Sequence, residues 1–509
     1  MVTFQSERRW TPFDPSGIGL FATVVALGAA ASFAIAAASI VEAPRLPENM
    51  PFAAVLERAR GNTGTQVIYN VHVWTIVVLV VCWLVVLARP SFRRLWIAFA
   101  AWTAPQFLAL TADVFNYVEQ GWVVLQGYDP TIEPAASIEG PFSHWVGSWA
   151  GTTVGYPAGA LLTSAAVVAI AGAHPVASLL LMHVPAVAGV VLAGVCLPRI
   201  ATAAGFDPRL AFGLVILNPF TLLELCGAAH NDALAFGLAV AAVWWAVRCQ
   251  NPAARILGAA LLLGLAATVK PQALAFAALL PAFGVLDGAA GNVFRRPLTA
   301  YAEGISTAVG ALGLLLISGP LTGVGQAFMS ATGTPGYRSS APLQILRIPL
   351  ESLFGERFTS SFFVQHFDTI CLVLVLVGTL LTITVLRMTQ PATMLTVLFG
   401  AFFLLGPAFR PWYAIWLILP LVLAPIRWNL KLPLLGSLMA LTLSVKNPQA
   451  LYLVNETFAY VLAVAVFIAL KFFVHRGDFT GLNPHLDGPV AETKSTTELD
   501  ELESMNHAK

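Results

Sequence analysis

One acid heads a row of polar side chains in the stretch LALTADVFNYVEQGWVVLQGYDP. Asn116, Tyr117 and Gln120 follow Asp113 at intervals of three, four and seven residues, which places all four on one face of an α-helix. A carboxylate with ordered polar neighbours can act as a general base and take a proton from a hydroxyl group. The alternative is a helix N-cap or a solvated acid. Glu119 lies off this face and is the weaker candidate.

Three cations are candidates for binding a phosphate group. Lys270 precedes Pro271 in TVKPQALAF, so a helix breaks there and the next helix offers its N-terminal amides to an anion. Arg410 precedes aromatic residues in FRPWYAIW, and Arg338 lies in the Gly- and Pro-containing stretch GTPGYRSS. The alternatives are a lysine that extends to the lipid headgroups and a surface arginine without a specific partner.

A second polar group follows a buried acid in LNPFTLLELCGAAHNDALAFGL. The stretch carries Glu224 through apolar surroundings and ends in His230, Asn231 and Asp232. A lone carboxylate in an apolar environment usually pairs with a cation or becomes neutral. The small residues between Glu224 and His230 permit close packing, which suits the wall of a site. The alternative is an ordinary polar loop between two helices.

The composition is that of a membrane protein. Of 509 residues, 58% are hydrophobic and 10% are charged, whereas soluble domains carry about 25% charge. Many apolar runs exceed the roughly 18 residues that indicate a membrane-spanning helix. We therefore predict an all-α, polytopic bundle with about fifteen apolar segments, 13–15 of them in the membrane. The expected segments are 17–41, 67–88, 95–111, 155–172, 176–197, 210–227, 233–248, 256–269, 271–286, 300–319, 367–387, 392–408, 411–425, 432–446 and 455–473.

The arginines and lysines of the short loops set the expected orientation, because such loops tend to stay in the cytoplasm. This orientation places Asp113 and Arg410 outside. It also places three long loops outside, at 42–66, 112–154 and 320–366. Aromatic residues in the last two loops suit helices that lie in the membrane interface.

One stretch conflicts with this orientation. Three apolar segments separate Asp113 from His230, and an odd number of crossings would put His230 on the cytoplasmic side. One of the three is therefore expected to be re-entrant, short or split. Arg199 and Arg209 favour the region 155–172 as the irregular one.

The chain is expected to form one transmembrane domain at 1–474 and a disordered, acidic cytoplasmic tail at 475–509, because the tail lacks apolar periodicity. We expect a multi-pass protein of the plasma membrane with its active site on the extracytoplasmic side. None of the five cysteines forms a CxxC pair, so no zinc site is expected, and we expect no other metal and no cofactor. The net charge of +1 gives no sign of a nucleic-acid partner, and none is expected.

Four stretches in order, ADVFNYVEQGWVVLQGYDP, NPFTLLELCGAAHND, KPQAL and FRPWYAIW, together resemble the polyprenyl-phosphomannose-dependent α-1,6-mannopyranosyltransferases of mycolic-acid-bearing actinobacteria. These are integral-membrane glycosyltransferases of the GT-C class, and the resemblance extends over about residues 70–470. It implies an extracytoplasmic cavity, a polyprenyl-phosphate-mannose donor and a mannan glycolipid acceptor of the lipomannan or lipoarabinomannan type. Asp113 matches the family's catalytic acid, which lies in the first long outer loop. The shorter loop 42–66 precedes it, so this match is loose.

The resemblance also implies roles for the other candidates. Asp113 is the base, and Lys270, Arg410 and Arg338 bind the donor phosphate. The leaving phosphate of β-linked phosphomannose needs cations but no acid, and one carboxylate then suffices for an inverting transfer that gives an α-linkage. The residues expected to bind the sugars or the acceptor are Asn116, Tyr117, Gln120, His230, Asn231, Asp232, Trp412 and Tyr413.

Other functions stay open. A polyprenyl-linked sugar or lipid transporter, or a flippase, would favour an internal repeat and polar residues near the membrane midplane. A ligase or phosphatase acting on polyprenyl pyrophosphate would call for a denser cation cluster. Another GT-C enzyme, such as an arabinofuranosyltransferase, is a further alternative. An ATP-driven pump is disfavoured because the chain has no GxxxxGK[ST] motif.

Overall fold

The computed structural model describes residues 15–42, 65–283, 293–329, 353, 366–385, 389–406, 410–444 and 464–471. Within these ranges all regular structure is helical and no strand occurs, which confirms the predicted all-α class. The expected tail at 475–509 and most of the expected outer loop at 320–366 lie outside the described residues.

Most of the helices coincide with predicted apolar segments. Proline at the first turn and side-chain caps fix many of their starts, such as Asn251 and Pro252 before α11. The α-helices are α1 (Pro15–Glu42), α3 (Thr65–Leu87), α4 (Phe92–Thr103), α5 (Ala112–Leu125), α6 (Ala158–Ile170), α7 (Pro175–Leu181), α8 (His183–Ala203), α9 (Pro208–Val215), α10 (Asn231–Arg248), α11 (Pro252–Val269), α12 (Leu298–Thr322), α15 (Phe367–Thr384), α16 (Pro391–Leu405), α17 (Ala414–Leu423) and α18 (Trp428–Ser444). Shorter turns include η1 (Ala104–Leu108), η4 (Thr221–Gly227), η5 (Pro271–Leu279) and η9 (Pro411–Tyr413).

Several helices are suited to crossing a membrane, so the protein is an integral membrane protein. Among the described residues, four helices are long and apolar enough by themselves, and the number rises to six if two bent helix pairs each count as one span. The first pair bends by 69° between η1 and α5, and the second by 108° between η4 and α10. Five further apolar helices have between 10 and 17 residues.

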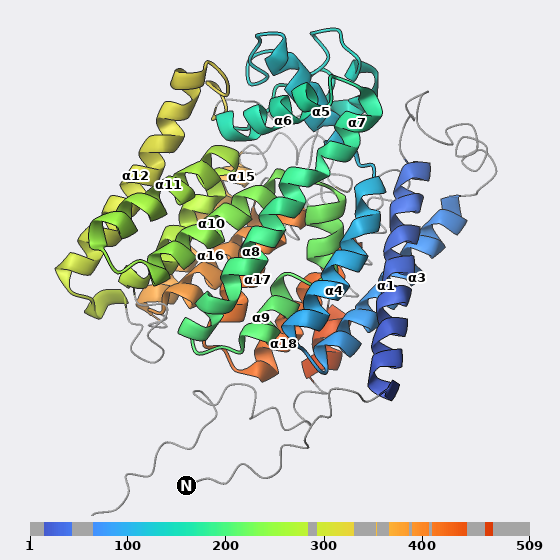
Figure 1. Cartoon of the computed structure of the whole chain (residues 1–509). Coiled ribbons are helices and arrows are strands. Elements are labelled where there is room, and N and C mark those ends of the chain that lie inside the picture. The colour runs from blue at the N-terminus through green and yellow to red at the C-terminus, as the bar shows by residue number, and fades with distance from the viewer. Residues whose placement is uncertain are drawn as a thin grey trace, which may run out of the picture.

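The region 155–172 forms one of these short helices. α6 has 13 residues, about 20 Å at 1.5 Å per residue, whereas the hydrocarbon core of a bilayer is about 30 Å thick. It lies beside α5 at one end of the bundle (Figure 1), and a Cβ on Gly121 of α5 would come within 2.5 Å of the Ser164 backbone of α6. This fits the expectation that the region is not an ordinary span.

Glycines allow two central helices to pack with their backbones in contact. A Cβ on Gly237 of α10 would lie 2.1 Å from the carbonyl oxygen of Gly189 in α8. On the other side of the bundle, Gln106 of η1 donates a hydrogen bond to the backbone of Ser32 in α1 at 2.9 Å. Gln106 lies shortly before α5, so its hydrogen bond anchors the chain close to the first bend.

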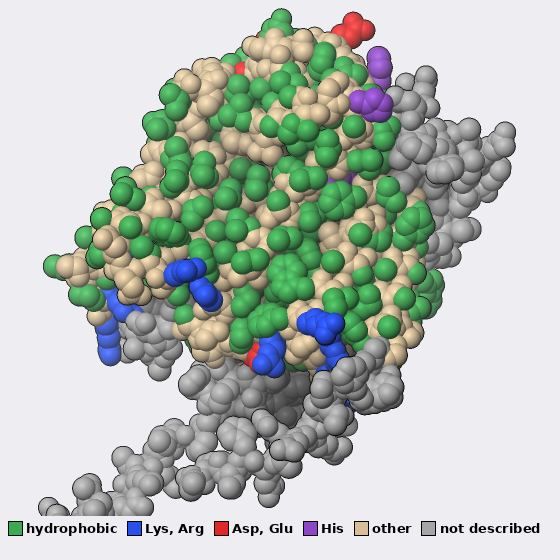
Figure 2. Space-filling model, in the orientation of Figure 1, with side chains coloured by type: hydrophobic (Ala, Val, Ile, Leu, Met, Phe, Trp, Pro, Cys, Tyr) green, Lys and Arg blue, Asp and Glu red, His purple; other side chains and the backbone are tan. Residues whose placement is uncertain are grey.

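The charges are unevenly distributed over the molecule. On the face that Figure 2 shows, Lys and Arg gather toward the lower end, histidines and an acidic side chain lie at the upper end, and hydrophobic side chains cover much of the surface between. Exposed apolar residues such as Leu257, Ile305 and Val309 belong to the outer helices α11 and α12. This is the surface expected of a protein whose sides face lipid.

Candidate active site

Asp113 lies at the start of α5, directly after the first bend. Thr111 is the N-cap of this helix, and its side chain accepts a hydrogen bond from the backbone N–H of Val114. Asp113 is therefore not the N-cap. Its side chain is only 16% exposed, so it is not a freely solvated acid either. The surroundings of Asp113 therefore support neither alternative, a helix N-cap or a solvated acid.

His230 lies between two carboxylates that come from different parts of the chain. Its Nδ1 is 3.4 Å from Asp113 Oδ2, and its Nε2 is 3.8 Å from Glu224 Oε2. The hydroxyl of Tyr117 lies 3.4 Å from the same Nδ1 and 3.5 Å from the hydroxyl of Tyr156. The sequence predicted that Tyr117 and Asp113 share a helix face, and the structure brings both to His230.

An irregular backbone carries Glu224 to this position. Residues Thr221–Gly227 form a π-helix, a form that is rare and often occurs at functional sites. His183 Nε2 lies 3.1 Å from the carbonyl oxygen of Gly227 and supports the end of this turn. Ala229 then has a φ of +51°, a conformation that costs a non-glycine residue about 1–3 kcal/mol. Such strained conformations persist where the surrounding structure enforces them, and they are common at functional sites.

A buried ion pair joins the start of α10 to the end of α11. Asp232 Oδ2 lies 3.1 Å from Lys270 Nζ, and Asp232 Oδ1 accepts a hydrogen bond from Trp416 Nε1 at 2.7 Å. The Lys270 ammonium also lies 4.9 Å from the ring centroids of Tyr156 and Tyr413. Burial raises the pKa of Tyr156 to about 12, so its hydroxyl stays protonated. The cation is thus held by one carboxylate and two aromatic faces.

Of the other two predicted phosphate ligands, the structure describes Arg410 but not Arg338. Arg410 directly precedes η9, and its positive charge acts on the Asp113 carboxylate together with the charges of Lys270 and Asp232. Side-chain contacts also connect the two ends of this group. Tyr117, which lies beside His230, touches Tyr156, and Tyr156 packs on Lys270. Arg338 lies outside the described residues, so its role as a phosphate ligand stays a prediction.

Two predicted aromatic residues contact the charged residues. The ring of Trp412 stacks on His230, with centroids 4.0 Å apart and planes inclined by 17°. Tyr413 packs against Lys270. Their predicted role as sugar ligands stays a prediction, but both lie in the site.

Several buried polar atoms of the residues predicted to bind sugars have no hydrogen-bond partner in the described part of the protein. They include Asn116 Oδ1, both amide atoms of Gln120, Asn231 Nδ2 and Trp412 Nε1. Because buried polar groups are normally hydrogen-bonded, such atoms call for an explanation. Glu119, the weaker candidate base, is fully buried and lies beside the Ser143 side chain.

The sequence did not identify three residues of the site as ligands, namely Glu224, Trp416 and Tyr156. Glu224 was noted as a buried acid that needs a partner, but nothing indicated that the partner is His230. Trp416 lies in an aromatic stretch that any membrane-spanning helix can show, and its hydrogen bond to Asp232 has no signal in the sequence. Tyr156 gave no signal, because its contact with Lys270 depends on how the segment before α6 folds over the end of α11. Within the described ranges, no group of three or more His, Cys, Asp or Glu side chains is arranged to hold a metal ion.

Loops at the same end of the bundle are tied together by Asp129. Its carboxylate accepts hydrogen bonds from the backbone N–H groups of Thr131, Gly325 and Gln326 at 2.9–3.0 Å. This links the segment after α5 to the segment after α12. Asp129 therefore connects distant parts of the chain near α6.

Comparisons with known proteins agree on one family. A family model described as "Alpha-(1->6)-mannopyranosyltransferase, N-terminal domain" matches residues 25–286, which include Asp113, His230, Asp232 and Lys270. No solved structure matches the chain.

Individual relatives carry similar names. The chain is 31% identical over 157 residues to alpha-(1->6)-mannopyranosyltransferase B of Corynebacterium glutamicum, over 30% of this chain and 26% of that protein. It is 29% identical over 160 residues to alpha-(1->6)-mannopyranosyltransferase A of Mycobacterium tuberculosis, over 31% of each. These two matches thus span less than a third of the relatives' length. A further alpha-(1->6)-mannopyranosyltransferase of M. tuberculosis is 25% identical over 433 residues, 73% of each chain.

Proposed function

The chain belongs to the alpha-(1->6)-mannopyranosyltransferase family, and from this premise we propose that it is an inverting mannosyltransferase. The donor is polyprenyl-phosphate mannose. The acceptor is the 6-hydroxyl of an α-1,6-mannan glycolipid, the backbone of lipomannan and lipoarabinomannan, on the outer face of the plasma membrane. The observation that supports this proposal is the cluster in which Asp113 is connected to Lys270 through His230, Tyr117 and Tyr156.

The proposed reaction is a single displacement at the anomeric carbon. Asp113 takes the proton from the acceptor's primary hydroxyl as its oxygen forms a bond to that carbon. The bond between the carbon and the phosphate oxygen breaks, and the electron pair leaves with the phosphate. Lys270 and Arg410 stabilise the negative charge that the phosphate gains. Attack from the face opposite the phosphate converts a β-linked mannose into an α-linked one.

His230 and Glu224 offer the proton a way out of the site. Protonated Asp113 faces His230 Nδ1 and can pass the proton to it, which restores the carboxylate for the next cycle. Glu224, on the Nε2 side of the ring, then stabilises the resulting imidazolium ion. The separation of 3.4 Å between Asp113 Oδ2 and His230 Nδ1 suits a contact that tightens when substrate binds.

The arrangement favours transfer over glycoside hydrolysis. A typical glycosidase needs two carboxylates that flank the same bond. Here Asp232 is engaged by Lys270 and Trp416, and Glu224 lies on the far side of His230 from Asp113. This leaves Asp113 as the acid that can reach a substrate hydroxyl.

Aromatic side chains next to Lys270 support a lipid-linked donor. Phe399, Phe402 and Phe403 of α16 line a small apolar gap that Tyr413 also borders. Tyr413 touches Lys270 on its other side. A phosphate held by Lys270 would therefore lie near the aromatic residues of α16. The gap itself is only about 10 Å³, so these side chains would have to move apart to admit the first unit of a polyprenyl chain. The free donors of Asn231 and Trp412 in the same cluster can bind sugar hydroxyls.

The test is mannose transfer by the purified protein to a short α-1,6-mannoside. Polyprenyl-phosphate mannose is compared with a nucleotide-linked mannose at equal concentration, and the linkage of the product is determined. We expect an α-1,6-linked product from the lipid-linked donor alone. Transfer from the nucleotide donor would contradict the donor assignment. Movement of the lipid-linked sugar across a vesicle membrane without transfer would instead show a transporter.

A further inference from the structure

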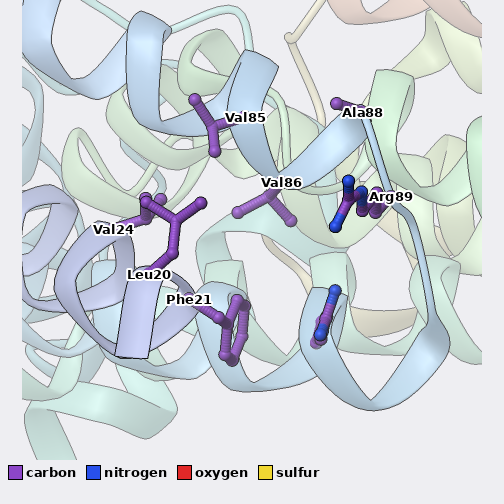
Figure 3. A pocket seen from close by; sticks show the side chains of 8 residues that line it. Leu20, Phe21, Val24, Val85, Val86, Ala88 and Arg89 are labelled. Carbon is purple, nitrogen blue, oxygen red and sulfur yellow. The ribbon is translucent and has the colours of Figure 1, made fainter. Parts of the chain in front are cut away.

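A second cavity lies at the other end of the bundle from α5. It encloses about 230 Å³ between the start of α1, the end of α3 and the start of α4, and its walls are six apolar residues and two arginines. Figure 3 shows Leu20, Phe21 and Val24 of α1 close to Val86 of α3, with Arg89 nearby. Neither the proposed reaction nor the family assignment gives this cavity a role.

The apolar wall opens towards the lipid side of the bundle. Leu20 is 60% exposed and Val85 is 40% exposed, although both belong to helices that form the body of the bundle. Val24 and Val86 form the buried floor, at 6% and 3% exposure. The volume is smaller than the roughly 300 Å³ of a pocket for a drug-sized molecule. The cavity therefore suits part of a hydrocarbon chain, and the rest of that chain would lie along the outside of the helices.

Among the described residues that line the cavity, the two charged ones are both arginines. Arg89 and Arg94 line the cavity, and none of the eight lining residues carries a carboxylate. The Arg94 guanidinium lies 5.3 Å from the ring centroid of Phe21, which holds it over the cavity wall. The N-terminus of α4 is here too, because Ser91 caps this helix and accepts the backbone N–H of Arg94. A helix start and two arginines together favour an anion, above all a phosphate group.

We propose that this cavity binds one anionic phospholipid. Its phosphate lies between Arg89 and Arg94, and one acyl chain occupies the apolar part between α1 and α3. The occupant is a lipid rather than free phosphate because six of the eight lining residues are apolar. A zwitterionic lipid fits less well, because its choline or ethanolamine group would bring a cation to a wall that is already positive. This inference does not depend on the proposed reaction.

The test is native mass spectrometry of the full-length protein in detergent. The protein is titrated with phosphatidylglycerol and with phosphatidylcholine that has the same acyl chains. We expect one phosphatidylglycerol to stay bound, with a clear preference over phosphatidylcholine. The double variant Arg89→Gln/Arg94→Gln should lose this preference, because each arginine at a membrane surface contributes about fivefold to the binding of an anionic lipid.

Two further variants make the result specific. Arg93 is exposed and does not line the cavity, so Arg93→Gln should leave the preference unchanged. Ala88→Trp puts a large side chain at the cavity wall and should abolish binding with both arginines intact. Mannose transfer is measured on all variants and should match that of the natural protein, because the cavity is remote from Asp113.

Three outcomes would overturn the proposal. Equal retention of the two lipids would show that the headgroup charge is not recognised. An equal loss in Arg93→Gln would show diffuse attraction instead of a site. Displacement of the bound lipid by millimolar inorganic phosphate would show that the arginines bind free phosphate.

Discussion

At the scale of single residues, the partners of Lys270 fix its position and are compatible with the proposed binding of a phosphate. An ammonium group has three N–H donors, and Lys270 directs it to Asp232 and to the faces of two tyrosines. The aromatic faces attract the charge without using up a strong hydrogen bond. A phosphate oxygen can therefore complete the coordination of Lys270 without breaking its pair with Asp232.

Replacing Lys270 by glutamine should raise the KM for the lipid-linked donor by at least about tenfold, because a charged hydrogen bond to phosphate is lost. The change also removes one partner of a buried pair, which typically costs about 3–5 kcal/mol of stability. Lys431→Gln is the matched control, since Lys431 is also fully buried and contacts Phe206 and Trp428 instead. The control should lose stability but keep the donor KM. A donor KM that is unchanged in Lys270→Gln would argue against its role.

Replacing Glu224 by glutamine should lower kcat by about tenfold or more and leave both KM values near normal. The reason is that glutamine keeps the size of the side chain but cannot stabilise a protonated His230. Glu303→Gln serves as the control. Glu303 pairs with Arg255 near the start of α11, about 22 Å along this helix from Lys270. The measurement is the steady-state kcat and KM of both variants. A normal kcat in Glu224→Gln would remove Glu224 from the proton path.

The spacing of residues predicted part of this site. Helical periodicity placed Tyr117 and Asp113 on one face, and the proline after Lys270 predicted the break where the cation lies. The pairing of Lys270 with Asp232 was not predictable, because these residues come from different helices and either could have faced solvent. The contact with Tyr156 depends on a segment without periodicity. Local patterns show which face a side chain occupies, but not what lies opposite.

At the scale of elements, helix breaks position each charged group. Asp113 starts α5 after a 69° bend, Asp232 starts α10 after a 108° bend, and Lys270 ends α11. Most breaks have a sequence signal, such as Asn218 and Pro219 before η4 or Pro271 after Lys270. The π-helix η4 has no such signal in the sequence, because its form depends on contacts with His183 and other distant residues. Side chains at helix ends can face one another where continuous helices would separate them.

The close contact of α8 and α10 should be sensitive to a single methyl group. In Gly237→Ala the new Cβ would meet the backbone of Gly189 at 2.1 Å, so α10 must shift. We expect a loss of about 1–3 kcal/mol in stability and a lower kcat, because Asp232 moves with its helix. Gly313→Ala in α12 meets no atom within 4 Å and should be neutral or stabilising by up to about 1 kcal/mol. Thermal unfolding in detergent compares the two, and equal melting temperatures would contradict the packing argument.

At the scale of the whole molecule, α5 lies at one end of the bundle, and the Lys and Arg side chains on the face that Figure 2 shows gather toward the other end (Figures 1 and 2). Because basic loops tend to stay in the cytoplasm, we expect Asp113 to lie on the outer side. The all-α class and most helix positions followed from apolar run lengths alone. The number of membrane crossings could not be predicted in this way, because helices of 10–17 residues can be core elements, half-spans or interfacial segments.

This orientation can be measured with single cysteines in intact cells, in a Cys249→Ser background that removes the one described cysteine that is not buried. Ser137 is exposed in the segment after α5, and Arg93 is exposed at the start of α4. A membrane-impermeant maleimide should label Ser137→Cys from outside and should label Arg93→Cys only after the cells are opened. The reverse pattern would place the site in the cytoplasm and exclude the proposed donor face.

The most direct measurement of the central claim compares mannose transfer by Asp113→Asn and Glu119→Gln at matched protein level. Donor binding is measured in parallel by displacement of labelled polyprenyl-phosphate mannose. We predict that Asp113→Asn lowers transfer by about 10²–10⁴-fold while donor binding persists, because the amide cannot accept the proton of the acceptor hydroxyl. Glu119→Gln should transfer mannose at nearly the normal rate. Near-normal transfer by Asp113→Asn, above all with an inactive Glu119→Gln, would contradict the account and move the base to Glu119.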